Sequence, residues 1–255
     1  MFDWFASLPP GHGASCGIAV DTGSGGSGSA GVYLQQRGKA ELIAPFLVSL
    51  GESGRLDAYI RLCERMPEGM EPAYIGLFPG RKGSPMRIGG YMSGRFLKTV
   101  AKEPERFGAC LDQIGFKAYT GPMLDRCAEL ISLVSDADYQ FDVCPDGTLG
   151  DGFGLSLSFN RVQPRMAAEC MAGGYGKAVM TLLAQWGLAD DRWKQIAGAA
   201  MARAIRVERA DGSLASLALI IRLNYAKVKF QAGVPVSAKF YLLLQAAVLP
   251  QSPEK

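Results

Sequence analysis

The sequence contains a single histidine, His12, among its 255 residues. Histidine-rich metal sites and mechanisms that need two imidazoles are therefore excluded, and no nucleophile–base pair of a hydrolase can be assembled from it. The chain also carries little net charge, since 27 Lys and Arg against 24 Asp and Glu leave a net charge of +3. No run of five basic residues occurs. A protein that coats nucleic acid is therefore not expected.

Paired cysteines and long apolar runs are missing as well. The six cysteines form no C-x-x-C motif, and the first residues lack the basic and apolar stretches of a secretory signal peptide. Scattered cysteines of this kind are typical of small buried side chains in a reducing compartment. Near-apolar runs such as Leu214 to Ile221 are much shorter than the ~20 residues of a membrane-spanning helix. We expect a cytoplasmic protein with no membrane span and no nucleic-acid partner.

Glycine is abundant, with 32 residues, and much of it lies in predicted β-hairpins. Alternating segments around Gly, Pro or Asp turns predict hairpins at Cys16 to Arg37, Ala73 to Met92, Tyr139 to Phe159 and Ile205 to Leu244. Segments with helical periodicity lie between them, the first over Gly38 to Met66. The hairpins start about 60 residues apart, which is typical of a repeated ββαα unit.

This order of elements predicts the α+β class. Hairpins whose strands are joined locally cannot build a parallel doubly wound sheet, so we expect antiparallel strands with helices on one face. With all helices on the same side, the strands curl into an antiparallel β-barrel of repeated hairpins surrounded by helices. An open sheet with one solvated face is the alternative. We expect a single domain over residues 1–255, built of four to five units, with loose ends at 1–15 and 250–255.

The two faces of the predicted strands differ in chemistry. Alternate side chains of a strand lie on the same face of the sheet. One set is apolar, and we expect helices to cover it: Val32, Leu34, Met86, Ile88, Leu155, Leu157, Phe159, Leu219, Ile221, Phe240 and Leu242. The other face is rich in cations, hydroxyls and tyrosines: Tyr33, Gln35, Arg37, Arg87, Tyr91, Ser156, Ser158, Arg222, Asn224, Lys227, Lys229, Lys239 and Tyr241. We expect few carboxylates on it. Such a face either is merely solvated or holds a polyanion such as a diphosphate.

Three strand motifs carry the basic and tyrosine residues of this polar face. They are PMRIGGYM around Arg87, AKVKF at Lys227 and Lys229, and SAKFYLLL with Lys239 and Tyr241. With the hairpin–helix order over most of the chain, they resemble the ABBA-type (αββα-repeat) prenyltransferases, above all the peptide-modifying enzymes of cyanobactin-like pathways. Four clear units are present where that family has five, and the strand-rich C-terminal segment could supply the fifth pair.

The resemblance implies an enzyme that moves an isoprenyl group from an allylic diphosphate to a peptide or small-molecule acceptor. The residues that would hold the diphosphate are Arg87, Arg222, Lys227, Lys229, Lys239 and Tyr241. Preplaced cations lower the barrier because they bind the leaving group best as its charge develops. Tyr33, Tyr91 and Tyr225 would line the prenyl and acceptor pocket and stabilise the allylic cation. No organic cofactor and no protein metal site are expected, and Mg²⁺ stays open as an escort of the diphosphate.

A basic group near the acceptor must take the proton that is lost as the new bond forms. In the resembled enzymes this group lies on the first strand, where the sequence offers Asp21 in GIAVD and His12 in PPGHGASC. The family's acidic position falls on Gly13, so the choice stays open, and Asp142 in YQFDV is a further candidate. The alternative function is a non-catalytic accessory module that holds a peptide or an anionic metabolite on the cationic strand face.

Overall fold

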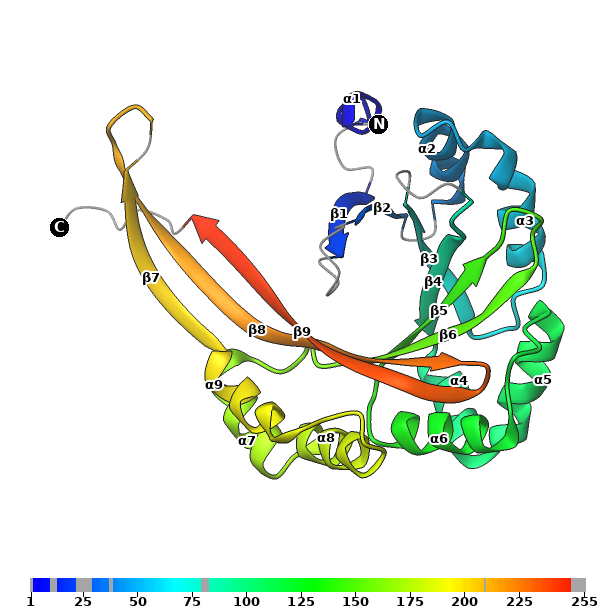
Figure 1. Ribbon diagram of the computed structural model, residues 1–255. Helices are drawn as coiled ribbons and strands as arrows, with labels where there is room; N and C mark the ends of the chain where they lie inside the picture. Colours follow the sequence, from blue (N-terminus) through cyan, green and yellow to red (C-terminus); the bar gives the residue numbers. More distant parts are fainter. Residues whose placement is uncertain are drawn as a thin grey trace. The chain divides into compact units, whose positions relative to one another are not determined.

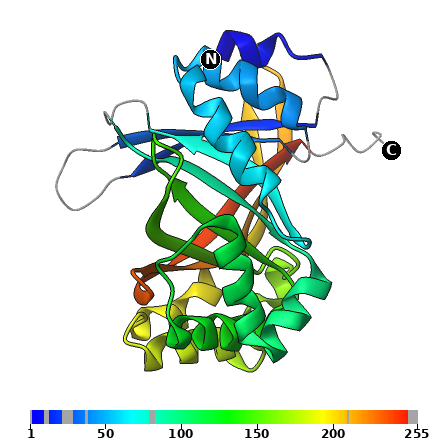
Figure 2. The same cartoon turned by 90° about the vertical axis from the view of Figure 1, so that its right-hand side faces the viewer.

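A computed structural model describes residues 2–9, 13–21, 29–36, 39–78, 83–208 and 210–248. The chain divides into two compact units (Figures 1 and 2). The first contains Met1–Leu155 and Lys229–Pro235, and the second contains Ser156–Val228 and Val236–Lys255. Both units combine helices with antiparallel strands, so the predicted α+β class is confirmed. The expectation of one domain stays a prediction.

Hairpins alternate with groups of helices along the chain (Figure 1). Up to the third hairpin the elements are α1 (Phe2–Ala6), β1 (Ser15–Asp21), β2 (Ser29–Gln35), η1 (Ala40–Leu42), α2 (Ile43–Ser49), η2 (Ser53–Arg55), α3 (Leu56–Glu64), β3 (Met70–Leu77), β4 (Met86–Met92), α4 (Gly94–Lys102), α5 (Pro104–Ile114), α6 (Gly121–Ser132), β5 (Ala137–Val143) and β6 (Leu149–Ser158). They continue with η3 (Pro164–Met166), α7 (Ala167–Ala172), α8 (Tyr175–Gln185), η4 (Asp191–Gln195), α9 (Ile196–Ala199), β7 (Met201–Glu208), β8 (Leu214–Gln231) and β9 (Val234–Val248). The predicted succession of hairpins and helices is confirmed.

The strands follow one another in the sheet almost in chain order. The order is β1-β2-β3-β4-β5-β6-β8-β7, and β9 pairs with β8. Neighbours from β1 to β5 are antiparallel, as hairpin connections require. Among the described strands this order ends at β1 and at β7, so the antiparallel sheet is confirmed and the closed barrel is not. Within the described ranges, no helix is long and apolar enough to cross a membrane.

The core of the first unit lies between its strands and the helices that cover one of their faces (Figures 1 and 2). Met86 and Ile88 of β4 enter this core and are at most 1% exposed. The rings of Phe141 and Phe153, on neighbouring strands, lie 5.3 Å apart between centroids. Leu155 is buried in the same core. The predicted apolar face is therefore confirmed for these positions, and the polar face of the same strands lies opposite the helices.

Local sequence signals set the ends of the covering helices. Ser93 precedes α4, and its Oγ accepts a hydrogen bond from the backbone N of Phe96 at 3.3 Å. Thr120 caps α6 in the same way. Helix α5 begins at Pro104 and is followed by Gly115, whose φ of 86° favours glycine. These caps fix where each helix meets the sheet.

The second unit has its own core, and its last strand corrects one prediction. Phe159 stacks on Tyr175 with ring centroids 5.0 Å apart and lies 5.1 Å from the ring of Phe240. Leu242 was expected on the same covered face, but its side chain is 43% exposed. The end of β9 runs beyond the helices that cover its earlier part. Residues 244–248, which follow Leu242 and Leu243, are all exposed as well.

Candidate functional site

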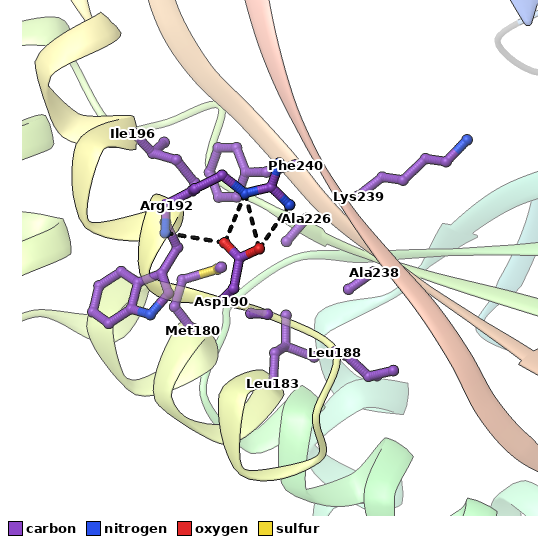
Figure 3. A pocket seen from close by; sticks show the side chains of 12 residues that line it. Met180, Leu183, Leu188, Asp190, Arg192, Ile196, Ala226, Ala238, Lys239 and Phe240 are labelled. Carbon is purple, nitrogen blue, oxygen red and sulfur yellow. Dashed lines mark hydrogen bonds and ion pairs between the residues drawn. The ribbon is translucent and has the colours of Figure 1, made fainter. Parts of the chain in front are cut away.

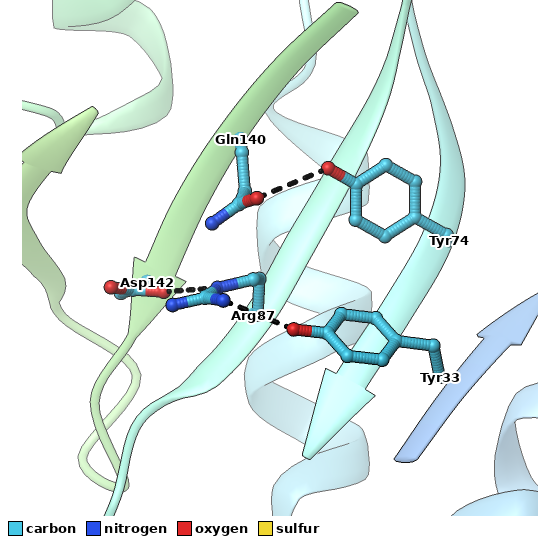
Figure 4. Close-up of polar contacts among 5 residues, drawn as sticks. All are labelled: Tyr33, Tyr74, Arg87, Gln140 and Asp142. Atoms are coloured by element: carbon cyan, nitrogen blue, oxygen red, sulfur yellow. Dashed lines mark hydrogen bonds and ion pairs between the residues drawn. The ribbon is translucent and has the colours of Figure 1, made fainter. Parts of the chain in front are cut away.

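The polar strand face of the first unit is organised in rows that cross several strands. One row, called the Arg87 row, runs from Tyr33 on β2 through Gly76 on β3 and Arg87 on β4 to Asp142 on β5. Nε of Arg87 donates to Oδ1 of Asp142 at 3.1 Å, and Nη1 donates to Oη of Tyr33 at 3.0 Å (Figure 4). The row is therefore already held together by an ion pair and a hydrogen bond.

Two strand glycines let tyrosine rings lie across the sheet. A Cβ at Gly76 would overlap the ring of Tyr33, its partner on β2, and a Cβ at Gly89 would overlap Tyr74, its partner on β3. The hydroxyl of each tyrosine consequently passes over the neighbouring strand and reaches the strand beyond it. Tyr33 meets Arg87 in this way, and Oη of Tyr74 donates to Oε1 of Gln140 at 3.3 Å (Figure 4). Gly76 of β3 and Gly89 of β4 thus shape the polar face.

The charge of Arg87 is balanced within the first unit. Burial opposes the charged form, but the carboxylate of Asp142 and the hydroxyl of Tyr33 outweigh it, so the pKa of Arg87 is raised. The guanidinium carbon also lies 5.1 Å from the centroid of the Phe78 ring. The expectation of few carboxylates is wrong for this face, because Asp142 and Asp138 both lie on it.

A second row, called the Asp138 row, contains a carboxylate that the sequence reasoning missed. Asp138 on β5 lies opposite Tyr91 on β4, which lies opposite Glu71 on β3. Burial, with repulsion from Asp136, raises the pKa of Asp138 to about 7. Oη of Tyr91 accepts a hydrogen bond from Nε2 of Gln35 at 3.1 Å. The alternation in ADYQFDV already put Asp138 on the face of Asp142, and that pattern could have revealed it.

The polar strand face of the second unit is built around two stacked tyrosines. The rings of Tyr225 on β8 and Tyr241 on β9 lie 4.3 Å apart between centroids. Strand alternation puts Lys227 on the face of Tyr225 and Lys239 on the face of Tyr241. Lys239 extends away from the helix side chains in Figure 3.

Arg222 joins the same face. Leu223 and Ala226 are both buried although they are three residues apart, so the alternation along β8 shifts between them and Arg222 stays with Tyr225 and Lys227. Among the described residues, Nε of Arg222 is buried and has no hydrogen-bond acceptor. Strands β8 and β9 contain no Asp or Glu. We call Arg222, Tyr225, Lys227, Lys239 and Tyr241 the second-unit cluster.

The opposite face of these strands closes a cavity against helices of the second unit. The cavity has a volume of about 430 Å³ and lies between α8, η4 and α9 on one side and β8 and β9 on the other (Figure 3). Its walls are mainly apolar, with Leu183, Trp193 and Phe240 among them. Arg192 pairs with Asp190 beside it, with Nε 2.8 Å from both carboxylate oxygens.

The predicted site residues are divided between the units. The first unit holds Asp21, Tyr33, Arg87, Tyr91 and Lys229, and the second holds the whole second-unit cluster. Lys229 and Asp142 both lie beside Gly152, where a Cβ would be 3.8 Å from Cε of Lys229 and 3.9 Å from Oδ2 of Asp142. Asp21 ends β1, its side chain is not described, and His12 lies outside the described residues. The roles of all these residues stay predictions.

The chain was compared with protein-family models, with curated proteins and with solved structures, and no match was found. The resemblance to ABBA-type prenyltransferases stays a prediction. In the part of the chain that the structure describes, no group of three or more His, Cys, Asp or Glu side chains could hold a metal ion.

Proposed function

We propose that the protein transfers an isoprenyl group from an allylic diphosphate to a peptide or small-molecule acceptor. The observation that carries the proposal is the second-unit cluster, in which three cations and two stacked tyrosines share one strand face. Lysine and arginine bind diphosphate oxygens through charge-assisted hydrogen bonds. A buried donor without an acceptor, such as Nε of Arg222, costs about 1–3 kcal/mol, which a bound anion would offset.

The chemistry begins with the allylic C–O bond. It breaks with its electron pair leaving on the diphosphate, and Arg222, Lys227 and Lys239 stabilise the charge that develops there. The stacked rings of Tyr225 and Tyr241 offer π-faces to the allylic cation and keep water from it. The acceptor then bonds to the allylic carbon and loses a proton. Any Mg²⁺ would arrive with the diphosphate, because the cluster offers amines, a guanidinium and phenols instead of carboxylate ligands.

An ABBA-type barrel is part of this proposal. The repeated order of hairpins and helices supports it, as does the antiparallel pairing from β1 to β5. The second candidate is the non-catalytic module that holds a peptide or an anionic metabolite. It is favoured by Arg87, a predicted diphosphate ligand whose charge Asp142 already balances. Formation of a prenylated product distinguishes the two candidates, because only the enzyme forms one.

The test is a transfer assay read by mass spectrometry. The protein is incubated with dimethylallyl or geranyl diphosphate and a panel of peptides and phenols, and the acceptors are examined for the mass of one prenyl group. We expect a prenylated product, formed more slowly by Lys239→Ala at limiting donor. The matched control is Lys194→Ala, since Lys194 lies in η4 of the same unit and pairs with Asp191. Donor binding without product would favour the module, and neither binding nor product would overturn the proposal.

A further inference from the structure

We propose that Ser156 of β6 binds the diphosphate of the donor together with Lys227 and Lys239. This inference rests on the proposed function and deepens it, because it adds a ligand of the anion and assigns the diphosphate to one end of the second-unit cluster. All three residues belong to the second unit. Alternation along β6 predicts Ser156 for the polar face but gives it no role.

Two backbone hydrogen bonds fix the register of β6 against β8, its neighbour in the sheet. The N of Phe159 donates to O of Asn224 at 2.6 Å, and the N of Ala232 donates to O of Asp151 at 3.0 Å. Residue numbers fall along β6 as they rise along β8, so the two strands are antiparallel. Equal lengths of both strands separate the two bonds, so the strands match residue for residue between them.

Ser156 lies opposite Lys227 in this register, three residues from the bond between Phe159 and Asn224. The adjacent pair, Leu157 and Ala226, is at most 1% exposed, so Ser156 and Lys227 are on the polar face. The Cβ atoms of directly opposite residues are about 4.5–5.5 Å apart. One anion can therefore contact both side chains.

Lys239 on β9 continues this row. The rings of Tyr225 and Tyr241 stack at 4.3 Å between β8 and β9, so these two residues lie opposite each other. The two strands form an antiparallel hairpin, so Lys227, two residues after Tyr225, faces Lys239, two residues before Tyr241. Like charges that face each other destabilise a sheet, and an anion between them removes the repulsion. We call Ser156, Lys227 and Lys239 the lysine row.

The hydroxyl of Ser156 is the observation that points to a ligand. The side chain is only 7% exposed, and within the described part of the chain no hydrogen bond reaches its Oγ. Buried polar groups are hydrogen-bonded in the great majority of cases. Ser158 differs, because its Oγ accepts a hydrogen bond from the backbone N of Asn160 at 3.4 Å. Ser156 therefore keeps a donor for a ligand.

A diphosphate matches the chemistry of the lysine row. Its oxygens accept charge-assisted hydrogen bonds from two ammonium groups and from the hydroxyl at the same time. The hydroxyl adds a donor without adding to the repulsion between the lysines. Tyr225 and Tyr241 lie next to the lysine row, so the allylic carbon comes over their rings when the diphosphate lies over the lysines.

The experiment is a calorimetric titration of Ser156→Ala with geranyl diphosphate and, separately, with inorganic pyrophosphate. We expect both ligands to bind about 10–100-fold more weakly than to the wild-type protein, because one hydrogen bond to a charged group is lost. The free energy of unfolding in urea should stay level or rise, since the hydroxyl has no partner in the described chain. Ser216→Ala is the matched control, because Ser216 faces Arg206 outside the lysine row, and it should keep the wild-type affinity.

A second variant tests the same position with the opposite charge. Ser156→Asp removes the hydroxyl donor and repels the diphosphate, so it should bind both ligands more weakly than Ser156→Ala does. Wild-type affinity in either variant would overturn the role of Ser156. A Ser156→Ala protein that is destabilised or fails to fold would assign the hydroxyl to the fold and overturn that role as well.

The two proposals fail in different ways. Prenyl transfer by the wild-type protein, with unchanged donor affinity in Ser156→Ala, would overturn the role of Ser156 and leave the proposed function standing. Absence of donor binding by the wild-type protein would overturn the proposed function, and the role of Ser156 with it.

Discussion

The polar strand faces of the two units differ in whether their strands carry carboxylates beside the cations. In the first unit, Arg87 is paired with Asp142 and bonded to Tyr33. In the second unit, Arg222, Lys227 and Lys239 lie on strands that contain no carboxylate. Arg222 is partly buried and Lys239 is exposed, and partly buried cations are normally compensated. The Arg87 pair therefore stabilises the sheet, whereas under the proposed function the buried Nε of Arg222 donates to an anionic ligand.

The largest expected effect is the difference in the free energy of unfolding between variants that replace Arg87 and Arg222 separately. Arg87→Met leaves the carboxylate of Asp142 partly buried without its cation, so the free energy of unfolding should fall by about 1–3 kcal/mol. Arg222→Met removes a buried donor that has no acceptor, so the free energy of unfolding should stay level or rise, while donor affinity falls about 10–100-fold. Urea unfolding and donor titration measure the two effects.

The control for this pair of variants is a second substitution. Asp142→Leu in the Arg87→Met background removes the uncompensated carboxylate and should recover most of the lost stability. If Arg222→Met were destabilised as much as Arg87→Met, the contrast between the two faces would be wrong.

The alternation of residues predicted much of the fold and part of the site. Met86 and Ile88 lie in the core and Arg87 lies on the polar face, because the side-chain period of a strand depends only on the sequence. The partner of Arg87 could not be predicted, since Asp142 is 55 positions away and meets it only through the register of β4 and β5.

Two other features also depend on the folded chain. The phase of β8 shifts between Leu223 and Ala226, although no Gly or Pro in that stretch announces it. Asp138 is one of two aspartates on the same face of β5, and burial in the folded chain, with repulsion from Asp136, raises its pKa above the ordinary value. The sequence could therefore place these residues on strands and faces, but it could not tell which charges would be compensated.

The pH dependence of stability sharpens the contrast within the first unit. The pKa of Asp138 is about 7 in the folded protein against an ordinary value of 3.8, so the folded state holds this proton more tightly than the unfolded state. The free energy of unfolding should therefore decrease as the pH rises from about 4 to about 7, by up to about 1.4 kcal/mol per pH unit. Urea unfolding at several pH values measures it. Asp138→Asn should remove this contribution, and an identical slope in the variant would contradict the assigned environment.

A smaller effect is expected from the glycine that accommodates Tyr74. In Gly89→Ala the new Cβ displaces the ring, and the hydrogen bond from Tyr74 to Gln140 is lost. The free energy of unfolding should fall by about 1 kcal/mol. Gly17→Ala is the matched control, because a Cβ at Gly17 of β1 would meet no atom within 4 Å. Equal costs in thermal unfolding for the two variants would mean that the tyrosines do not depend on these glycines.

Calorimetric titration with geranyl diphosphate tests the assignment of the second-unit cluster most directly. We expect the wild-type protein and Lys194→Ala to bind the donor alike, and Lys239→Ala to bind it about 10–100-fold more weakly, since one charge-assisted contact is lost. Equal affinity of Lys239→Ala and the wild-type protein, or no binding by the wild-type protein, would contradict the account.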